Sequence, residues 1–169
     1  RKPRTRARGP ESSIIGLTTM RIYLDTSVYN RPFDDQAQPR IWLETLALSV
    51  ILQLVESGEI ELVASTVVAY ENSRNPFAER REWVERVMAL AVDYRPVTSA
   101  IRDRAGSLQE TGIKSLDALH VATAEAALAA YFITVDNRLI RSYRRRPDQG
   151  LAMIDPATFV REIVEQDLE

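Results

Sequence analysis

The sequence contains no cysteine and only one histidine, which excludes several kinds of chemistry at once. Without cysteine there is no disulfide, no zinc–thiolate site and no thiol nucleophile, so a reducing compartment is expected and we predict a cytoplasmic protein. Glycine and proline, at 6 and 8 of 169 residues, are too scarce for a fibrous or low-complexity chain. No uncharged apolar run approaches the ~18 residues of a membrane-spanning helix.

The remaining composition suits one compact domain. Hydrophobic residues make up 45% of the chain and charged residues 27%. The formal net charge of −2 argues against a general nucleic-acid-binding protein, but it is compatible with an acidic site whose substrate charge is neutralised by a metal ion. Residues 1–19 differ, because five of the first ten are basic. We interpret them as a disordered or non-native tail, the alternative being a basic arm that contacts a nucleic acid, and we expect a single domain over residues 20–169.

Residues 115–138, SLDALHVATAEAALAAYFITVDNR, show how the domain is organised. The alanine-rich part predicts a helix that lies close against a sheet, with Ser115 as its N-cap. The β-branched run 131–135 predicts a buried strand. About thirteen helical residues and about five strand residues span similar lengths, roughly 20 and 17 Å, so the strand returns the chain to the level of the helix start. Asp117 and Asp136 are therefore expected at the same carboxyl edge of a sheet.

The rest of the chain repeats this alternation of strands and helices. Further strands are predicted at residues 21–24, 60–64, 95–97 and 151–154, with helices between them. The helix over residues 39–57 carries two apolar stripes, so it is predicted to bury one face on the sheet and one on a neighbour or partner. The alternation predicts an α/β protein whose parallel sheet has four or five short strands and is covered by helices on both faces.

Four acids are predicted at the carboxyl edge: Asp25 after the first strand, Glu71 in the helix after the second, and Asp117 and Asp136. Carboxylates within ~4 Å repel by about 4 kcal/mol per pair at an effective dielectric of ~20, so such a cluster takes up protons or binds a cation. Oxygen ligands favour Mg²⁺ or Mn²⁺, and such an ion suits phosphodiester hydrolysis by a metal-bound water. The alternative is that Asp117 is only a helix-dipole charge and Asp136 only a turn former.

Four motifs in this order resemble the PIN domain, in particular the VapC-type toxins of bacterial and archaeal toxin–antitoxin pairs. The motifs are YLDTS at residues 23–27, Glu71 in its helix, DALHVA at 117–122 and TVDNRL at 134–139. The resemblance covers residue 20 to about residue 164. The loop over residues 31–38 is longer than in the simplest members, which leaves the position of Asp34 and Asp35 open.

The resemblance implies a three-layer α/β/α sandwich and an Mg²⁺-dependent endoribonuclease. Its catalytic and metal-binding acids would be Asp25, Glu71, Asp117 and Asp136. Ser27 corresponds to an auxiliary polar residue of such sites, and Thr134 to the threonine that precedes the last acid. Partners implied in the same way are an RNA substrate, a second copy of the chain and an antitoxin protein, for which the helix over residues 39–57 is a candidate contact surface.

Basic residues near the acids are candidates for contacts with RNA phosphates. Residues 138–146 hold the densest basic cluster of the domain, so Arg138 and Arg141 are candidates, as is Lys114. The alternative is a solvated helix end. For His120, on an alanine-rich helix, we predict a packed and hydrogen-bonded role rather than a catalytic one.

Two other functions compete with the nuclease. A PIN-like scaffold without catalysis would only bind RNA or a protein, and metal binding separates it from the enzyme. A phosphatase or phospho-acceptor with Asp25 as nucleophile is disfavoured, because residues 25–27 lack a second aspartate two positions on.

Overall fold

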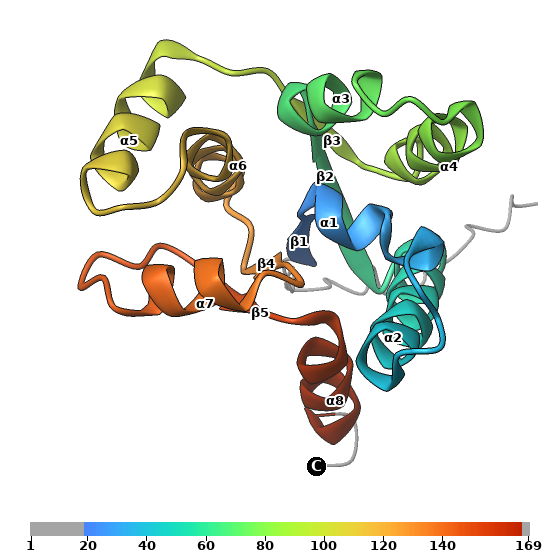
Figure 1. Cartoon of the computed structure of the whole chain (residues 1–169). Helices are drawn as coiled ribbons and strands as arrows, with labels where there is room; N and C mark the ends of the chain where they lie inside the picture. Colours follow the sequence, from blue (N-terminus) through green and yellow to red (C-terminus); the bar gives the residue numbers. More distant parts are fainter. Residues whose placement is uncertain (1–18, 167–169) are drawn as a thin grey trace, which may run out of the picture.

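The computed structural model describes residues 19–166 and shows one parallel sheet (Figure 1). Its five strands lie in the order β3-β2-β1-β4-β5, and every neighbouring pair is parallel. The strands are β1 (Met20–Leu24), β2 (Ile60–Ser65), β3 (Asp93–Arg95), β4 (Tyr131–Ile133) and β5 (Ala152–Ile154). The predicted α/β class and parallel sheet are confirmed.

Helices cover both faces of this sheet. Figure 1 shows α5, α6 and α7 on one side and α2 and α4 on the other. The helices are α1 (Thr26–Tyr29), the 3-10 turn η1 (Arg31–Phe33), α2 (Pro39–Glu56), α3 (Thr66–Ser73), α4 (Ala78–Met88), α5 (Ser99–Glu110), α6 (Ser115–Ala126), α7 (Asn137–Arg144) and α8 (Pro156–Gln166). Within residues 19–166, none of them has the length and apolar character that crossing a membrane requires.

The strand order reverses between β1 and β4. The chain first moves from β1 to β2 and β3, and then returns through α5 and α6 to place β4 on the other side of β1. Leu24 pairs with Ile133, and the amide of Asp25 donates to the carbonyl of Ile133 at 2.9 Å. Open α/β sheets bind ligands at the carboxyl ends of the strands where the order reverses, so Asp25 lies at the favoured place.

Small and aromatic residues fill the core near this reversal. Tyr23 is fully buried and its ring stacks on Phe132, with 5.3 Å between centroids. Ala118 and Ala122 of α6 are buried, and their short side chains allow the helix to approach its neighbours closely. The alanine-rich helix is thus packed on the sheet side as its composition predicts.

Two local predictions need correction. Lys114, not Ser115, is the N-cap of α6, because its extended carbonyl accepts the first helical hydrogen bond, from the amide of Ala118 at 2.8 Å. The strand expected at 95–97 lies at Asp93–Arg95, because Pro96 has no amide hydrogen to donate to a ladder.

Helix α2 buries one face, not two, in the single chain. Its buried face includes Ile41, Leu48 and Ile51, whereas Trp42, Leu43 and Leu46 are 51%, 52% and 44% exposed. A partner for this exposed face stays a prediction. The predicted tail at residues 1–19 lies, apart from its last residue, outside the described residues.

Candidate active site

Asp25 follows β1 and is held by two hydroxyl groups. Its Oδ2 atom accepts hydrogen bonds from Ser27 Oγ at 2.9 Å and from Thr134 Oγ1 at 2.7 Å. The side chain is buried, with 6% of the residue exposed. Its Oδ1 atom accepts no hydrogen bond from any residue in the described range, and His120 Nε2 lies 3.9 Å away. One oxygen therefore fixes the carboxylate, and the other remains available to a ligand.

Glu71 reaches the same point from α3. Its Oε1 atom accepts hydrogen bonds from Thr26 Oγ1 at 3.0 Å and from His120 Nε2. Partial burial opposes ionisation of this carboxyl, but the hydrogen bond and positive charge of His120 outweigh it, so the pKa of Glu71 lies below its ordinary value. Again one oxygen is engaged, and the second has no partner in residues 19–166.

His120 is fully buried between the strands and α3, and both of its ring nitrogens are used. Nδ1 lies 2.7 Å from the hydroxyl of Tyr23, which lies 2.7 Å from Ser65 Oγ. Because the ionised carboxyl of Glu71 can only accept, Nε2 carries the hydrogen of this contact. Burial lowers the pKa of His120. The hydrogen bond to Glu71 and the charge of Asp25 raise it by more than burial lowers it, so the pKa of His120 lies above its ordinary value. The packed role predicted for His120 matches this geometry, and its contact with Glu71 makes it a positioning residue.

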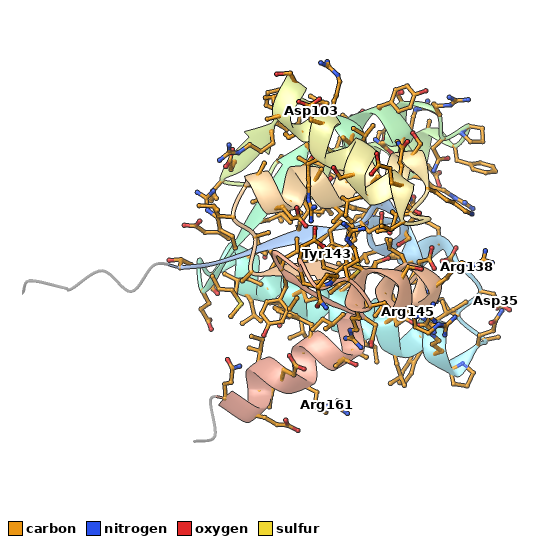
Figure 2. The ribbon with its side chains drawn as sticks, turned by 90° about the vertical axis from the view of Figure 1, so that its left-hand side faces the viewer. Asp35, Asp103, Arg138, Tyr143, Arg145 and Arg161 are labelled. Carbon is orange, nitrogen blue, oxygen red and sulfur yellow. The ribbon has the colours of Figure 1, made fainter. Side chains whose placement is uncertain are left out.

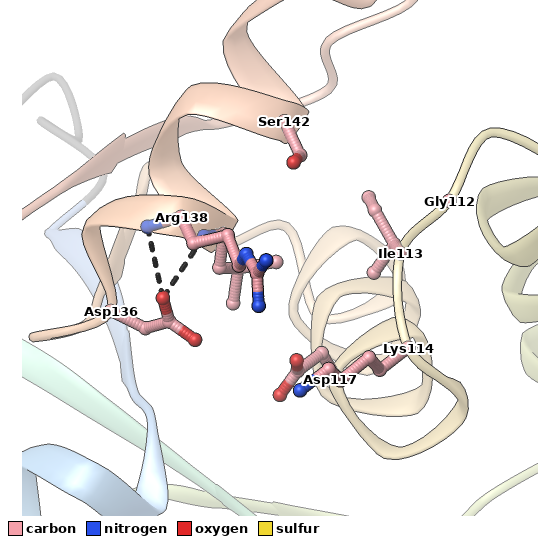
Figure 3. A pocket seen from close by; sticks show the side chains of 8 residues that line it. Gly112, Ile113, Lys114, Asp117, Asp136, Arg138 and Ser142 are labelled. Carbon is pink, nitrogen blue, oxygen red and sulfur yellow. Dashed lines mark hydrogen bonds between the residues drawn. The ribbon is translucent and has the colours of Figure 1, made fainter.

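Asp136 caps the helix that follows β4. Its Oδ1 atom accepts hydrogen bonds from the amides of Arg138 at 2.9 Å and Leu139 at 3.2 Å (Figure 3). Thr134 Oγ1 accepts from the amide of Asp136 at 3.1 Å while donating to Asp25. Thr134 thus couples the positions of the two aspartates.

Asp117 faces Asp136 across an open pocket of about 300 Å³ (Figure 3). The residues that line it come from the loop before α6, from α6 and from α7: Gly112, Ile113, Lys114, Asp117, Asp136, Arg138, Leu139 and Ser142. Burial, and then the negative charges of Asp25, Asp136 and Glu71, raise the pKa of Asp117 to about 6. Asp117 is therefore close enough to the other three acids to feel their negative charge.

The donor set fits a hard divalent cation. Asp25, Glu71 and Asp136 each use one oxygen for positioning and leave the other free of hydrogen bonds from the described residues. One ligand atom each of Asp25, Glu71 and His120 lies within 4.8 Å of the others, although Nε2 of His120 already donates to Glu71. Asp117 and Asp136 do not belong to this group of three and line the pocket beside it. Carboxylate oxygens are the ligands that Mg²⁺ and Mn²⁺ prefer.

The structure sorts the other residues singled out in the sequence. Lys114 and Arg138 line the pocket, and Arg141, on the same helix, does not. Asp34 and Asp35 do not line the pocket. Asp34 forms an ion pair with Arg31 at 3.1 Å, and Asp35 accepts a hydrogen bond from the amide of Ala37 at 3.0 Å.

Several supporting residues escaped the sequence analysis. Thr26 and Tyr23 hold Glu71 and His120, and Ser142 lines the pocket. The role of Tyr23 could have been predicted from the two-residue period of β1, because this period places Tyr23 and Asp25 on the same face. Nothing in the local sequence indicates that α2 also supports the site, although Arg40 donates to the carbonyl of Val135 at 2.8 Å, directly before Asp136.

Comparison with known proteins decides the family. The sequence model described as the PIN domain matches residues 22–145. The chain belongs to the PIN domain family. Members of this family are generally nucleases and typically use divalent metals, so the acidic cluster lies in a fold suited to metal-assisted hydrolysis.

Two solved structures share this PIN fold. VapBC2 from Rickettsia felis, bound to a DNA fragment from its promoter, is similar with a TM-score of 0.53 and 15% identity, over 80% of this chain and 98% of that one. PAE2754 from Pyrobaculum aerophilum is similar with a TM-score of 0.55 and 17% identity, over 93% and 100%. At such identities the likeness shows the fold alone. No curated protein matches the sequence.

Proposed function

We propose that this PIN domain is an Mg²⁺-dependent endoribonuclease and the toxin of a type II toxin–antitoxin pair. The observation that carries the proposal is a pair of groupings at the reversal of the strand order, connected through Thr134. Asp25 and Glu71 have carboxylate oxygens close enough to share an ion, and Asp117 and Asp136 line one pocket. The raised pKa of Asp117 also supports it: burial contributes most, and the negative charges of Asp25, Asp136 and Glu71 add a part that a cation would relieve.

The four acids would hold Mg²⁺, with Mn²⁺ as a substitute. When bound, the ion would supply charge neutralisation for the phosphodiester and activation of water. The residues of the chain fix the acids: Ser27 and Thr134 hold Asp25, while Thr26 and His120 hold Glu71. Lys114 and Arg138, which line the pocket, bind the phosphates of the substrate.

The toxin assignment adds an antitoxin and a second copy of the chain as partners. One of the two similar structures is named as a VapBC2 assembly, which supports an antitoxin partner for this chain. The exposed apolar face of α2, formed by Trp42, Leu43 and Leu46, is the surface we assign to such a contact. We place the nuclease in one domain over residues 20–169.

Cleavage of labelled total RNA in the presence of Mg²⁺ tests the proposal. Asp25→Asn keeps the size of the side chain and removes the charge, so we expect cleavage to fall at least about 100-fold, because metal charge stabilisation is worth several kcal/mol. Asp103→Asn is the matched control, since Asp103 is exposed on α5 and does not line the pocket of Asp117 and Asp136.

Binding of Mn²⁺, followed by titration calorimetry, separates enzyme from scaffold. We expect the unsubstituted chain to bind Mn²⁺ and Asp25→Asn to bind it more weakly. Full cleavage by Asp25→Asn would overturn the assignment of this residue. A folded chain that neither binds Mn²⁺ nor cleaves RNA would instead favour the PIN-like scaffold.

A further inference from the structure

The five arginines of residues 138–146, on α7 and directly after it, divide into two groups. Arg144 donates to the carbonyl of Met153 at 2.8 Å, and Arg146 pairs with Asp148 at 3.0 Å and donates to Thr111. These two guanidinium groups hold the fold together. By contrast, the side chains of Arg138, Arg141 and Arg145 make no hydrogen bond or ion pair with any residue in the range 19–166.

Two of these unpaired arginines line adjoining pockets. Arg138 lines the pocket that contains Asp117 and Asp136, and Arg145 lines a second pocket of about 500 Å³. Ser142 belongs to the lining of both, so the pockets meet at this residue. Residues 138, 142 and 145 have the i, i+4, i+7 spacing of one helix face, and Figure 2 shows Arg138 and Arg145 on the same side of the molecule. Arg141 lines neither pocket.

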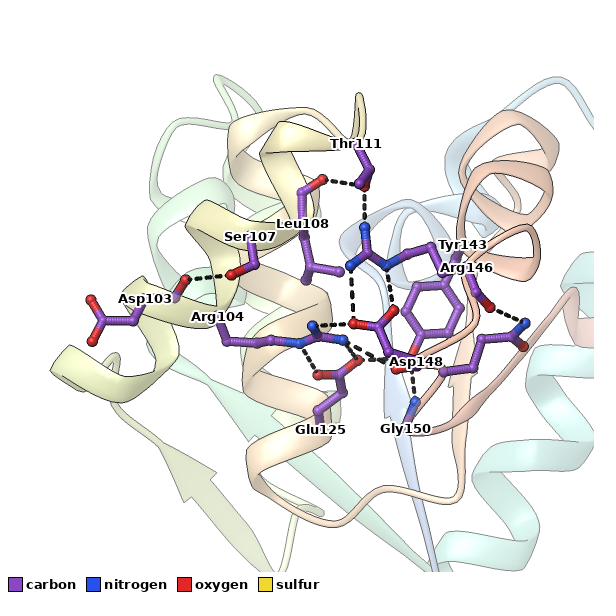
Figure 4. A network of polar contacts seen from close by, with 11 residues as sticks. Asp103, Arg104, Ser107, Leu108, Thr111, Glu125, Tyr143, Arg146, Asp148 and Gly150 are labelled. Carbon is purple, nitrogen blue, oxygen red and sulfur yellow. Dashed lines mark hydrogen bonds and ion pairs between the residues drawn. The ribbon is translucent and has the colours of Figure 1, made fainter.

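The acidic residue that lines the second pocket, Asp148, is already paired with arginines. Asp148 accepts ion pairs from Arg146 and from Arg104, the latter at 2.7 Å, and these contacts lower its pKa to about 2 (Figure 4). Arg104 also pairs with Glu125 of α6 at 2.7 Å. The network therefore ties α5, α6 and the loop after α7 together, and it leaves Arg145 as the cation of this pocket that no described residue neutralises.

We propose that this second pocket binds the RNA backbone on one side of the cleaved phosphodiester, with Arg145 contacting a phosphate. The inference rests on the proposed ribonuclease function and adds a subsite to it. An RNA strand whose reacting phosphate lies beside Asp117 and Asp136 must continue either past Ser142 into the second pocket or in the opposite direction. Arg138 and Arg145 are seven residues apart, about 10 Å along the helix, against a rise of roughly 3.4 Å per stacked nucleotide, so they contact different phosphates.

Binding of a labelled RNA to the full chain carrying Asp25→Asn tests the subsite without cleavage. The probe is a fluorescein-labelled single-stranded RNA of mixed sequence, followed by anisotropy at several salt concentrations. We expect Arg145→Gln to weaken binding roughly 3- to 10-fold and to lower the slope of log Kd against log salt by about 0.7, the value for one phosphate contact on a single strand.

Two further variants control for surface charge. Arg141→Gln removes the same charge from the same helix. The sequence made Arg141 a candidate for a phosphate contact, but it lines neither pocket, so the proposal gives it no contact and we expect the RNA affinity to stay within about twofold of the parent. Arg145→Lys keeps a cation in the second pocket, so we expect it to retain most of the salt dependence. Equal losses for Arg141→Gln and Arg145→Gln, or no loss for Arg145→Gln, overturn the subsite.

The two proposals fail in different ways. Absence of Mg²⁺-dependent cleavage by the unsubstituted chain overturns the ribonuclease, whereas cleavage that is unaffected by Arg145→Gln overturns only the subsite. An acidic peptide is the competing occupant of a basic pocket. If oligoglutamate binds in an Arg145-dependent way and RNA does not, the pocket is a protein-docking site and the proposal is wrong.

Discussion

Replacing Asp117 by asparagine should stabilise the metal-free protein, although it removes a residue of the candidate active site. Asp117 has its pKa raised from 3.8 to about 6 by burial and by Asp25, Asp136 and Glu71. The folded chain therefore holds this proton more tightly than the unfolded chain, so stability falls as pH rises between about 4 and 6. Above about pH 6 the folded chain carries the full free-energy cost of an ionised Asp117, and an uncharged asparagine avoids this cost.

The magnitude follows from the shift. Two pKa units correspond to roughly 3 kcal/mol, and this value is an upper bound because Asp117 is only partly buried and solvent screens its charge. A discounted value of about 1.5 kcal/mol corresponds to a rise in Tm of roughly 3–6 °C for a domain of this size. Below about pH 3.8 the carboxyl is neutral in both states, so the two proteins should have the same Tm.

Thermal unfolding followed by circular dichroism, with a chelator present and at pH values from 3.5 to 8, measures this difference. Asp103→Asn, on the exposed side of α5, should leave Tm unchanged throughout. Saturating Mg²⁺ should reverse the order, because a ligand at 100 times its Kd adds about 2.7 kcal/mol to the chain that binds it. A metal-free Asp117→Asn protein that melts below the parent at pH 7.5 would refute the reasoning, since the acids would then not repel one another.

Two further substitutions test the residues that hold the acids. Thr134→Val removes the hydroxyl that joins Asp25 to Asp136, and should weaken Mn²⁺ binding about 10- to 100-fold by calorimetry. Thr158→Val, which breaks a similar bond to Asp155 outside the pocket of Asp117 and Asp136, should not change Mn²⁺ affinity, and equal losses would contradict the role of Thr134. Tyr23→Phe leaves His120 Nδ1 without a buried partner and removes one of the two hydrogen bonds of Ser65 Oγ, and should cost about 1–3 kcal/mol of unfolding free energy in urea; a neutral result would show that water replaces the hydroxyl.

The sequence already contained the order of the elements and the positions of the acids relative to strands. Alternation of β-branched runs with helical patterns predicts a parallel sheet, because each strand must be buried on both faces. Asp25 directly follows β1, and Asp136 comes three residues after the end of β4, so their place at the carboxyl edge was predictable. Helix starts were less so: Lys114 caps α6 through its backbone conformation, which a preference for serine does not reveal.

Only the tertiary structure decided which side chains hold those acids and which arginines remain unpaired. Tyr23, Ser65, His120 and Glu71 come from four elements, and their contacts depend on how β1, β2, α3 and α6 pack against one another. The basic cluster at residues 138–146 looks uniform in sequence, yet packing engages Arg144 and Arg146 and leaves Arg138 and Arg145 facing adjoining pockets. Local sequence determines the periodicity of each element, because periodicity depends on residues a few positions apart. Partners between distant elements are set by the packing of the whole chain.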